Sequence, residues 1–234
     1  MGKVRFSRKN IKWILVMLPF YGRKLSRKTK NFSLTCLRKN EFFFDESKFR
    51  IIRKRINSSY SDVNLEIGFG RGENMIFQSQ IKKNEIFFAI DPYLSGGMRL
   101  QRKIEILQIS NILFSYLPFS EFFNLIKDVN FKRVYILFPD PWPKRKHNKR
   151  RLINKEFVNN LNKITHKNSE IFIATDDQGY SDQISKNFSR EKNFKLALKR
   201  DDDLSFHDYE IYPTKYFKKA KNENRKINFF IFTK

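Results

Sequence analysis

Beyond Asp62, short apolar runs alternate along the chain with amphipathic stretches, and this alternation limits the possible folds more than any other feature. Such a pattern is typical of a parallel sheet whose buried strands are joined by crossover helices. It therefore predicts an α/β fold, with strands at Val63–Ile67, Ile86–Ile90, Ile112–Ser115, Arg133–Phe138, Glu170–Ala174, Phe194–Leu198 and Ile227–Phe232. The amphipathic stretches predict helices at Glu73–Ile81, Met98–Gln108, Phe119–Lys127, Lys155–Thr165, Asp177–Ser189 and Thr214–Lys221.

Residues 1–60 differ from the rest of the chain in their charge. They carry 17 Lys and Arg against 3 Asp and Glu, so more than half of the net charge of +24 lies in a quarter of the sequence. We expect a partly flexible basic arm over residues 1–60, ending in a helix near Ser47–Ile56, followed by one folded domain over residues 61–234. A solvated linker without a role is the alternative.

The overall charge indicates the kind of partner. An excess of +24 is self-repulsive in a folded protein and is usually matched by a polyanion. Nucleic acid is favoured over a membrane because the basic residues surround motifs of catalytic type; a generally basic surface is the alternative. The single cysteine, Cys36, excludes an intramolecular disulfide framework and a cysteine-based zinc site. The apolar run Ile14–Phe20 is too short to span a bilayer, so we expect a cytoplasmic protein.

A glycine-rich turn, Gly68-Phe69-Gly70-Arg71-Gly72, follows the first expected strand. Glycine lets the backbone approach a ligand closely, although many such turns use glycine only for packing. The spacing departs from the dinucleotide fingerprint, and no phosphate-binding lysine follows it. Glu66, just before the turn, would repel a pyrophosphate and suits a cationic ligand better. A nucleotide-dependent dehydrogenase is therefore disfavoured.

A second acid, Asp91, ends the second expected strand, where a carboxylate commonly binds ribose hydroxyls. Capping of the following loop is the alternative role. Two acids at adjacent strand ends, with glycines between them, suit S-adenosylmethionine, which carries ribose hydroxyls, an amine and a sulfonium. These strand ends favour a methyltransferase over an NAD enzyme.

The most distinctive motif is Phe138-Pro139-Asp140-Pro141-Trp142-Pro143-Lys144, which continues into a run of Lys and Arg. The prolines restrict the backbone around Asp140 and so hold its carboxylate rigidly. Asp176 ends a further expected strand, and ligands bind at the carboxyl edge of open α/β sheets. Although ion pairing would explain each acid alone, we expect Glu66, Asp91, Asp140 and Asp176 to line one edge beside a basic strip.

Taken together, these motifs resemble the bacterial tRNA (guanine-N7-)-methyltransferase family from about Phe20 to the C terminus. The resemblance is carried by Glu66-Ile67-Gly68-Phe69-Gly70, Ile90-Asp91-Pro92, Phe138-Pro139-Asp140-Pro141-Trp142, His147-Asn148-Lys149-Arg150-Arg151, Ala174-Thr175-Asp176 and Pro213-Thr214-Lys215-Tyr216. It implies a Rossmann-like class I methyltransferase fold, with a seven-stranded mixed sheet, helices on both faces and a basic N-terminal extension. It also implies methyl transfer from S-adenosylmethionine to N7 of a guanosine in the variable loop of tRNA.

The resemblance further implies roles for particular residues. It assigns cofactor binding to Glu66, Gly68, Gly70, Asp91 and Asp140, and catalysis to Asp140. It assigns substrate binding to Lys144, Asp176, Thr214, Lys215, Tyr216 and Phe217, and RNA phosphates to Lys146, His147, Asn148, Lys149, Arg150 and Arg151. We expect no metal, no obligatory protein partner, and a monomer or weak homodimer.

Two positions depart from the family pattern. The acid expected near the adenine falls at Pro118, and the Thr-Lys-aromatic-Glu motif ends in Phe217. The missing carboxylates are either compensated locally, with Ser115, Glu121 and Glu223 as candidates, or their loss reduces activity. A non-catalytic RNA-binding protein on a decayed methyltransferase fold and a methyltransferase for another RNA base are the alternatives.

The chemistry expected at this site needs no general base. Guanine N7 carries an in-plane lone pair, so an in-line attack on the sulfonium methyl depends chiefly on positioning. We expect Asp140 to orient the base and to stabilise the positive charge that develops on its imidazole ring. Asp176 is expected to accept hydrogen bonds from N1–H and the exocyclic amine, and Trp142 either stacks on RNA or packs beneath the loop.

Overall fold

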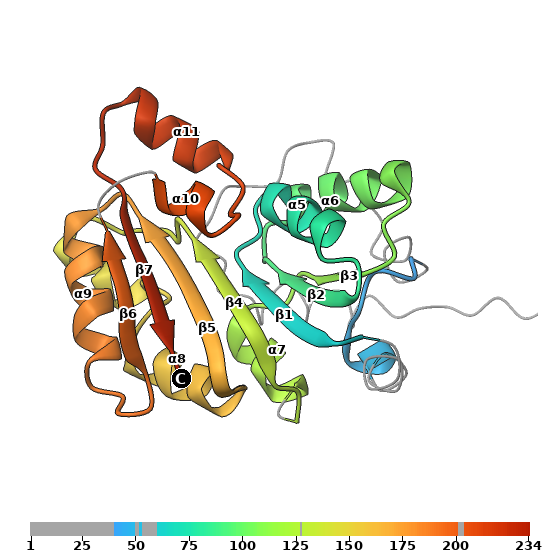
Figure 1. Ribbon diagram of the computed structural model, residues 1–234, viewed down its shortest axis with the longest axis horizontal. Coiled ribbons are helices and arrows are strands. Elements are labelled where there is room, and N and C mark those ends of the chain that lie inside the picture. Colours follow the sequence, from blue (N-terminus) through green and yellow to red (C-terminus); the bar gives the residue numbers. More distant parts are fainter. Residues whose placement is uncertain (1–39, 50–51, 53–59, 127, 201–203) are drawn as a thin grey trace, which may run out of the picture.

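The computed structural model describes residues 40–49, 52, 60–126, 128–200 and 204–234 (Figure 1). Its strands are β1 (Asp62–Ile67), β2 (Glu85–Ile90), β3 (Ile112–Ser115), β4 (Phe131–Leu137), β5 (Thr165–Thr175), β6 (Lys195–Arg200) and β7 (Asn228–Thr233). Its helices are α5 (Glu73–Ile81), α6 (Leu94–Leu107), α7 (Phe119–Leu125), the 3₁₀ helix η1 (Arg145–Arg150), α8 (Lys155–Lys163), α9 (Gln178–Phe188), α10 (Leu204–Asp208) and α11 (Lys215–Asn222).

The seven strands form one sheet in the order β3-β2-β1-β4-β5-β7-β6. β1 pairs in parallel with both β2 and β4, and β4 pairs in parallel with β5. The last strand, β7, is antiparallel to its neighbours β5 and β6, so the expected seven-stranded mixed sheet is confirmed. The strand order reverses between β1 and β4, and ligands bind beside the carboxyl ends of strands at such a switch point.

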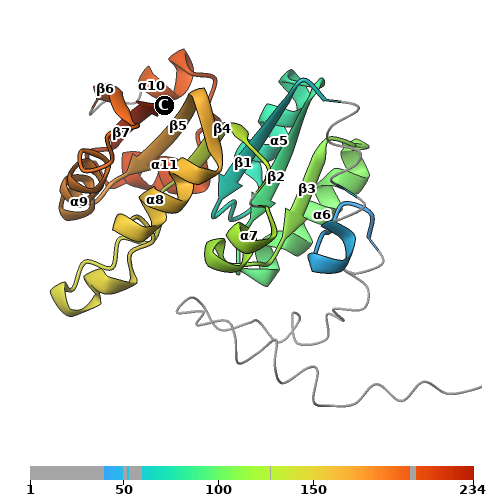
Figure 2. The same cartoon turned by 90° about the horizontal axis from the view of Figure 1, so that it is seen from below.

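Helices cover both faces of this sheet, as expected (Figure 2). Apolar side chains of α7, α8 and α9 join one buried cluster, which includes Phe88 and Phe131 from the sheet. Side chains of α5, α6, α10 and α11 join a second cluster on the opposite face. In the described part of the chain, no helix combines the length and apolar character needed to cross a membrane.

The folded unit begins before residue 61, which differs from the boundary expected from charge. Phe43 forms a parallel bridge with Phe114. The Phe114 N–H donates to Phe42 O at 2.8 Å, and the Phe44 N–H donates to Phe114 O at 3.0 Å. Phe44 is fully buried, so this segment belongs to the domain core. Residues 46–49 are helical and overlap the start of the expected Ser47–Ile56 helix. Residues 1–39, 50–51 and 53–59 of the expected arm lie outside the described residues.

α6 begins four residues earlier than its apolar pattern predicts, and its two glycines explain the difference. A Cβ at Gly96 would lie 1.9 Å from Gly70 O, and a Cβ at Gly97 would lie 2.2 Å from a ring carbon of Tyr116. Gly96 therefore permits the first turn of α6 to pack against the glycine-rich turn after β1, and Gly97 permits it to pack against Tyr116. A sequence feature that usually weakens a helix is therefore used here for packing.

Candidate active site

The glycine-rich turn joins β1 to α5 through three left-handed backbone positions. Gly68, Gly70 and Gly72 have φ values of 83°, 56° and 71°, a region that side-chain-bearing residues rarely adopt. A Cβ at Gly68 or Gly70 would meet no protein atom within 4 Å, whereas a Cβ at Gly72 would lie 2.5 Å from Leu100 Cδ1. The first two glycines therefore face open space, and the third is needed for packing against α6.

Asp91, directly after β2, is tied to this turn. Its Oδ2 accepts a hydrogen bond from the Gly70 N–H, and its Oδ1 accepts one from the Tyr93 N–H, both at 2.8 Å. Burial raises the pKa of Asp91 to about 6; the two backbone hydrogen bonds oppose the rise, and Asp140 adds to it. The loop-capping role is thus present, and each carboxylate oxygen retains acceptor capacity for a further donor.

Glu66 lies at the carboxyl end of β1 and is 2% exposed. Asn74 Nδ2 from α5 donates to Glu66 Oε2 at 3.4 Å. Burial raises the pKa of Glu66 to about 8; the Asn74 hydrogen bond opposes the rise, and Asp91 and Glu73 add to it. A buried carboxyl with so high a pKa lacks a cationic partner in the described structure, and a bound cation would favour its ionised form.

Asp140 follows β4 in a loop of unusual backbone geometry. Phe138 and Trp142 both have positive φ, at 55° and 43°, and the Phe138 N–H donates to Ala174 O at 2.8 Å. Such conformations cost free energy and persist only where the surroundings impose them. The loop presents Asp140 at the surface, close enough to Asp91 to raise its pKa. Acids from β1, β2 and β4 therefore converge at the switch point.

Asp176 lies after β5, the next strand of the sheet, and is engaged by a residue that the sequence motifs do not include. Arg225, in the loop before β7, forms an ion pair with Asp176 through Nη1 and Oδ2. Arg225 Nε also lies 3.0 Å from Glu223 Oε2. Nothing in the local sequence marks Arg225, because its partner is distant along the chain.

The α11 segment is tethered to the start of α5, beside the glycine-rich turn. The Lys215 N–H donates to Glu73 Oε2 at 2.8 Å, and the Tyr212 N–H donates to Asn74 Oδ1 at 3.2 Å. Asn74 therefore links Glu66 to the segment that leads into α11. These contacts bring the start of α11, with the expected substrate residues Thr214–Phe217, next to the expected cofactor residues.

The four positions at the start of α11 have different environments. Thr214 caps the helix by accepting from the Phe217 N–H at 3.4 Å, and Lys215 and Tyr216 are exposed. Phe217 is half-buried and packs on Phe206, with ring centres 4.5 Å apart. The phenylalanine that stands in place of the family's glutamate therefore packs α11 against α10. Glu223, a candidate for compensation, contacts Arg225 and reaches Asp176 only through it.

The other departure lies at the start of α7. Pro118 occupies the N-cap position of this helix, and Ser115 at the end of β3 is buried. Glu121 lies in the first turn of α7, where partial burial raises its pKa. The structure thus places both proposed compensating residues near Pro118 along the chain, without assigning either one to a ligand.

The basic strip after Asp140 forms η1. Lys144, Lys146 and Lys149 are exposed, and Arg150 lies with its guanidinium carbon 5.0 Å from the centre of the Trp142 ring. His147 meets the same ring edge-on at 5.9 Å between centres. Trp142 thus packs within the strip while remaining partly exposed.

Two members of this strip differ from their neighbours. The pKa of His147 lies below its usual value because of desolvation, with nearby cations adding to the effect. With its amide nitrogen facing the backbone, Asn148 donates to Trp142 O at 3.0 Å, so it holds the loop together.

Arg151 departs from the expected surface strip. It is only 5% exposed, and its guanidinium points inward to backbone and side-chain acceptors of the Asp140 loop and α9. Arg151 therefore differs from the exposed cations of the strip, because donors on its guanidinium are already engaged within the protein. The sequence gives no sign of this difference, since six basic residues look alike in a run.

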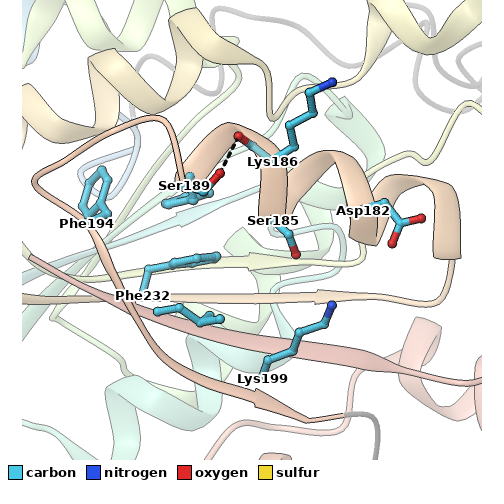
Figure 3. A pocket seen from close by; sticks show the side chains of 9 residues that line it. Asp182, Ser185, Lys186, Ser189, Phe194, Lys199 and Phe232 are labelled. Carbon is cyan, nitrogen blue, oxygen red and sulfur yellow. Dashed lines mark hydrogen bonds between the residues drawn. The ribbon is translucent and has the colours of Figure 1, made fainter.

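A cavity lies elsewhere, between α9 and the edge formed by β6 and β7 (Figure 3). It has a volume of about 650 Å³, and its lining includes Phe188, Phe232 and Lys199. None of the candidate site residues lines it, so this cavity is separate from the candidate site.

The residues at the switch point fit S-adenosylmethionine. Open space above Gly68 and Gly70 leaves room for close approach, and the buried carboxyl of Glu66 suits a positively charged group. Asp91 retains acceptor capacity for hydroxyls. Among the described residues, no group of three His, Cys, Asp or Glu side chains is arranged to hold a metal ion.

Comparisons with known proteins agree with this geometry. A family model described as "Putative methyltransferase" matches residues 61–230. A tRNA (guanine-N(7)-)-methyltransferase of Wolbachia pipientis wMel is 44% identical over 177 residues, which cover 76% of this chain and 77% of the relative. The enzyme of that name from Neorickettsia sennetsu is 31% identical over 183 residues, covering 76% and 80%. The solved 16S rRNA methyltransferase KamB has a TM-score of 0.58 at 12% identity, over 81% of this chain and 94% of that chain, and shows the fold alone.

The mixed sheet, the glycine-rich turn and the acids at its switch point define a class I methyltransferase, a class of enzyme that uses S-adenosylmethionine. Within this class, the two relatives described above, which match over three quarters of this chain, identify the family. The chain belongs to the tRNA (guanine-N7-)-methyltransferase family.

Proposed function

We propose that this protein transfers a methyl group from S-adenosylmethionine to N7 of a guanosine in the variable loop of tRNA. The observation that carries the proposal is the convergence of Glu66, Asp91 and Asp140 from β1, β2 and β4 beside the tethered α11 segment. The family names of the relatives support the same reaction. The polyanionic substrate also accounts for the net charge of +24.

Glu66 and Asp91 would hold the cofactor, with Gly68 and Gly70 allowing its close approach. The ionised Glu66 carboxylate would offset the cofactor's positive charge in a site of low dielectric, and Asp91 would accept from ribose hydroxyls. When bound, S-adenosylmethionine supplies an electrophilic methyl group on a sulfonium. The turn then needs no phosphate-binding lysine, in agreement with its sequence.

Asp140 would act at the junction of cofactor and guanine. Its loop is braced by proline and by imposed positive-φ positions, so the carboxylate would orient the base without reorganising during the reaction. Attack by N7 moves positive charge onto the imidazole ring, which a fixed anion stabilises. N7 has no proton to lose, so Asp140 serves charge stabilisation and alignment rather than proton transfer.

Asp176 would read the Watson–Crick edge of the guanine. Its carboxylate accepts hydrogen bonds and so favours the N1–H and exocyclic amine of guanine over the edge of adenine. The ion pair with Arg225 holds Asp176 at Oδ2 and leaves acceptor capacity on the group. Thr214, Lys215, Tyr216 and Phe217 would complete the pocket from the start of α11, and Lys144 would also contact the substrate.

The exposed cations of η1 would bind tRNA phosphates, a contribution that weakens as salt rises. A variable loop suits this site because an unstacked base can enter a pocket. We further propose that the protein acts in the cytoplasm as a monomer or weak homodimer, without an obligatory protein partner.

The direct test is methyl transfer from labelled S-adenosylmethionine to unmodified tRNA, followed by nucleoside analysis. The proposal expects 7-methylguanosine at one site in the variable loop. If the label appeared in a different base, the protein would instead be a methyltransferase for that RNA base. Tight tRNA binding with no label would identify a non-catalytic RNA-binding protein instead.

A further inference from the structure

Arg151 lies directly after η1, but its side chain turns into the protein. Nε donates to Pro141 O at 2.7 Å, and Nη1 donates to Gly179 O at 3.1 Å and to Gln183 Oε1 at 2.9 Å. Nη2 lies 3.5 Å from Asp177 Oδ1. The planar guanidinium therefore uses donors on all three of its nitrogens toward groups within the protein, which a lysine cannot reproduce.

The Arg151 side chain also packs against the buried ring of Tyr180. The guanidinium carbon lies 5.0 Å from the centre of the Tyr180 ring, and Tyr180 is fully buried. The Tyr180 hydroxyl accepts from the Ile153 N–H at 2.9 Å, two residues after Arg151. Arg151 thus has one well-determined position rather than the freedom of a surface cation.

The partners of Arg151 lie beside the two acids of the proposed acceptor site. Pro141 is the residue after Asp140, in the loop that follows β4. Asp177 is the residue after Asp176, and its side chain caps α9 by accepting from the Tyr180 N–H at 2.7 Å. Arg151 is therefore a cross-brace between the loop that carries Asp140 and the helix start that carries Asp176.

We propose that Arg151 is a positioning residue that fixes Asp140 relative to Asp176, and thereby aligns guanine N7 with the methyl group. This inference rests on the proposed function. One acid would orient the base at its reacting side and the other at its Watson–Crick edge, so their separation sets the angle of attack. A misplacement of about 1 Å can cost on the order of a hundredfold in rate.

The test compares Arg151→Lys with Arg190→Lys, the same chemical change at an exposed arginine after α9. Single-turnover methyl transfer is measured at saturating cofactor and tRNA, on protein quantified by active-site titration. We expect the rate constant of Arg151→Lys to fall by about ten- to a hundredfold, with KM for tRNA and Kd for the cofactor within about twofold of wild type. Arg190→Lys should match wild type.

Asp177→Asn supplies a second variant that keeps a good helix cap while removing the charge opposite Nη2. Its rate constant should fall less, and the double variant should be no slower than Arg151→Lys alone, because both changes break one brace. A role confined to stability would lower the melting temperature without changing the rate constant of the folded, titrated enzyme, and would overturn the proposal.

A phosphate-binding Arg151 predicts a different result, which would also overturn the proposal. The variant would keep its rate constant, raise KM for tRNA, and reduce the salt dependence of binding by about one phosphate contact. If the wild-type protein transfers no methyl group to tRNA, the proposed function itself fails. An active wild type with an unaffected Arg151→Lys defeats only the present inference.

Discussion

The protonation of Glu66 should control cofactor affinity near neutral pH. In the free protein its pKa lies at about 8, so only about a tenth of the protein carries an ionised Glu66 at pH 7. If the bound cofactor requires the carboxylate, each binding event at that pH also removes a proton. The associated penalty is about 1.4 kcal/mol, one pKa unit of free energy.

The expected pH dependence follows from the ionised fraction. Between pH 6.5 and pH 8 this fraction rises from about 3% to about 50%, so affinity for S-adenosylmethionine should rise about fifteenfold. Asp91, with a pKa of about 6, is already mostly ionised in this range and contributes little to the slope. Affinity rises with pH because the Glu66 pKa is raised in the free protein, so at lower pH the carboxyl is protonated and must lose its proton when the cofactor binds.

Isothermal titration across this range, in wild type and Glu66→Gln, provides the assay. The cofactor's own α-amino group titrates near pH 8, so the difference between the two proteins isolates the carboxylate. Glu66→Gln should bind more weakly at pH 8 and lose the extra slope. Equal slopes in both proteins would refute the view that an ionised Glu66 holds the cofactor.

Three further predictions follow from the same geometry. Glu66→Gln should raise the free energy of unfolding at pH 8 by about 4 kcal/mol. The reason is that the Glu66 carboxyl stays protonated in the folded protein between about pH 4.5 and about pH 8, so wild-type stability falls as pH rises through that window. Chemical denaturation at pH 4 and pH 8 checks this. Gly72→Ala should lower the melting temperature more than Gly70→Ala, whereas Gly70→Ala should weaken cofactor binding more, since a Cβ clashes with Leu100 only at Gly72; equal effects at the two sites would contradict the assignment. Lys149→Ala should weaken binding of all tRNAs alike and reduce the slope of log Kd against log salt by about one, as measured by filter binding; an unchanged slope would remove Lys149 from the interface.

The sheet could be predicted from the sequence because its strands are buried and uninterrupted. Five consecutive apolar residues in Val134–Phe138 leave little alternative to a central strand, and β4 covers Phe131–Leu137. β5 begins at Thr165 rather than at the predicted Glu170. Its first five residues are polar, so they show no alternation of apolar and polar residues from which a strand could be predicted. α10 (Leu204–Asp208) was not expected, since a single turn held by Phe206 against Phe217 leaves no periodic pattern.

The acids of the site could also be predicted, because each lies at or just after the end of an expected strand. The side chains that contact these acids could not be predicted from the sequence. Arg225 meets Asp176 from the far end of the chain, and Asn74 meets both Glu66 and the segment before α11. Arg151 shows the limit most clearly, since burial rather than composition separates a brace from the surface cations beside it.

The central claim is that a single site at the switch point holds the donor methyl group and a guanine against Asp140. Its most direct test is single-turnover methylation of unmodified tRNA by wild type and Asp140→Ala, with tRNA affinity measured in parallel. The account predicts 7-methylguanosine from the wild type and no detectable product from Asp140→Ala, with tRNA Kd essentially unchanged. Product formation at the wild-type rate by Asp140→Ala would contradict it.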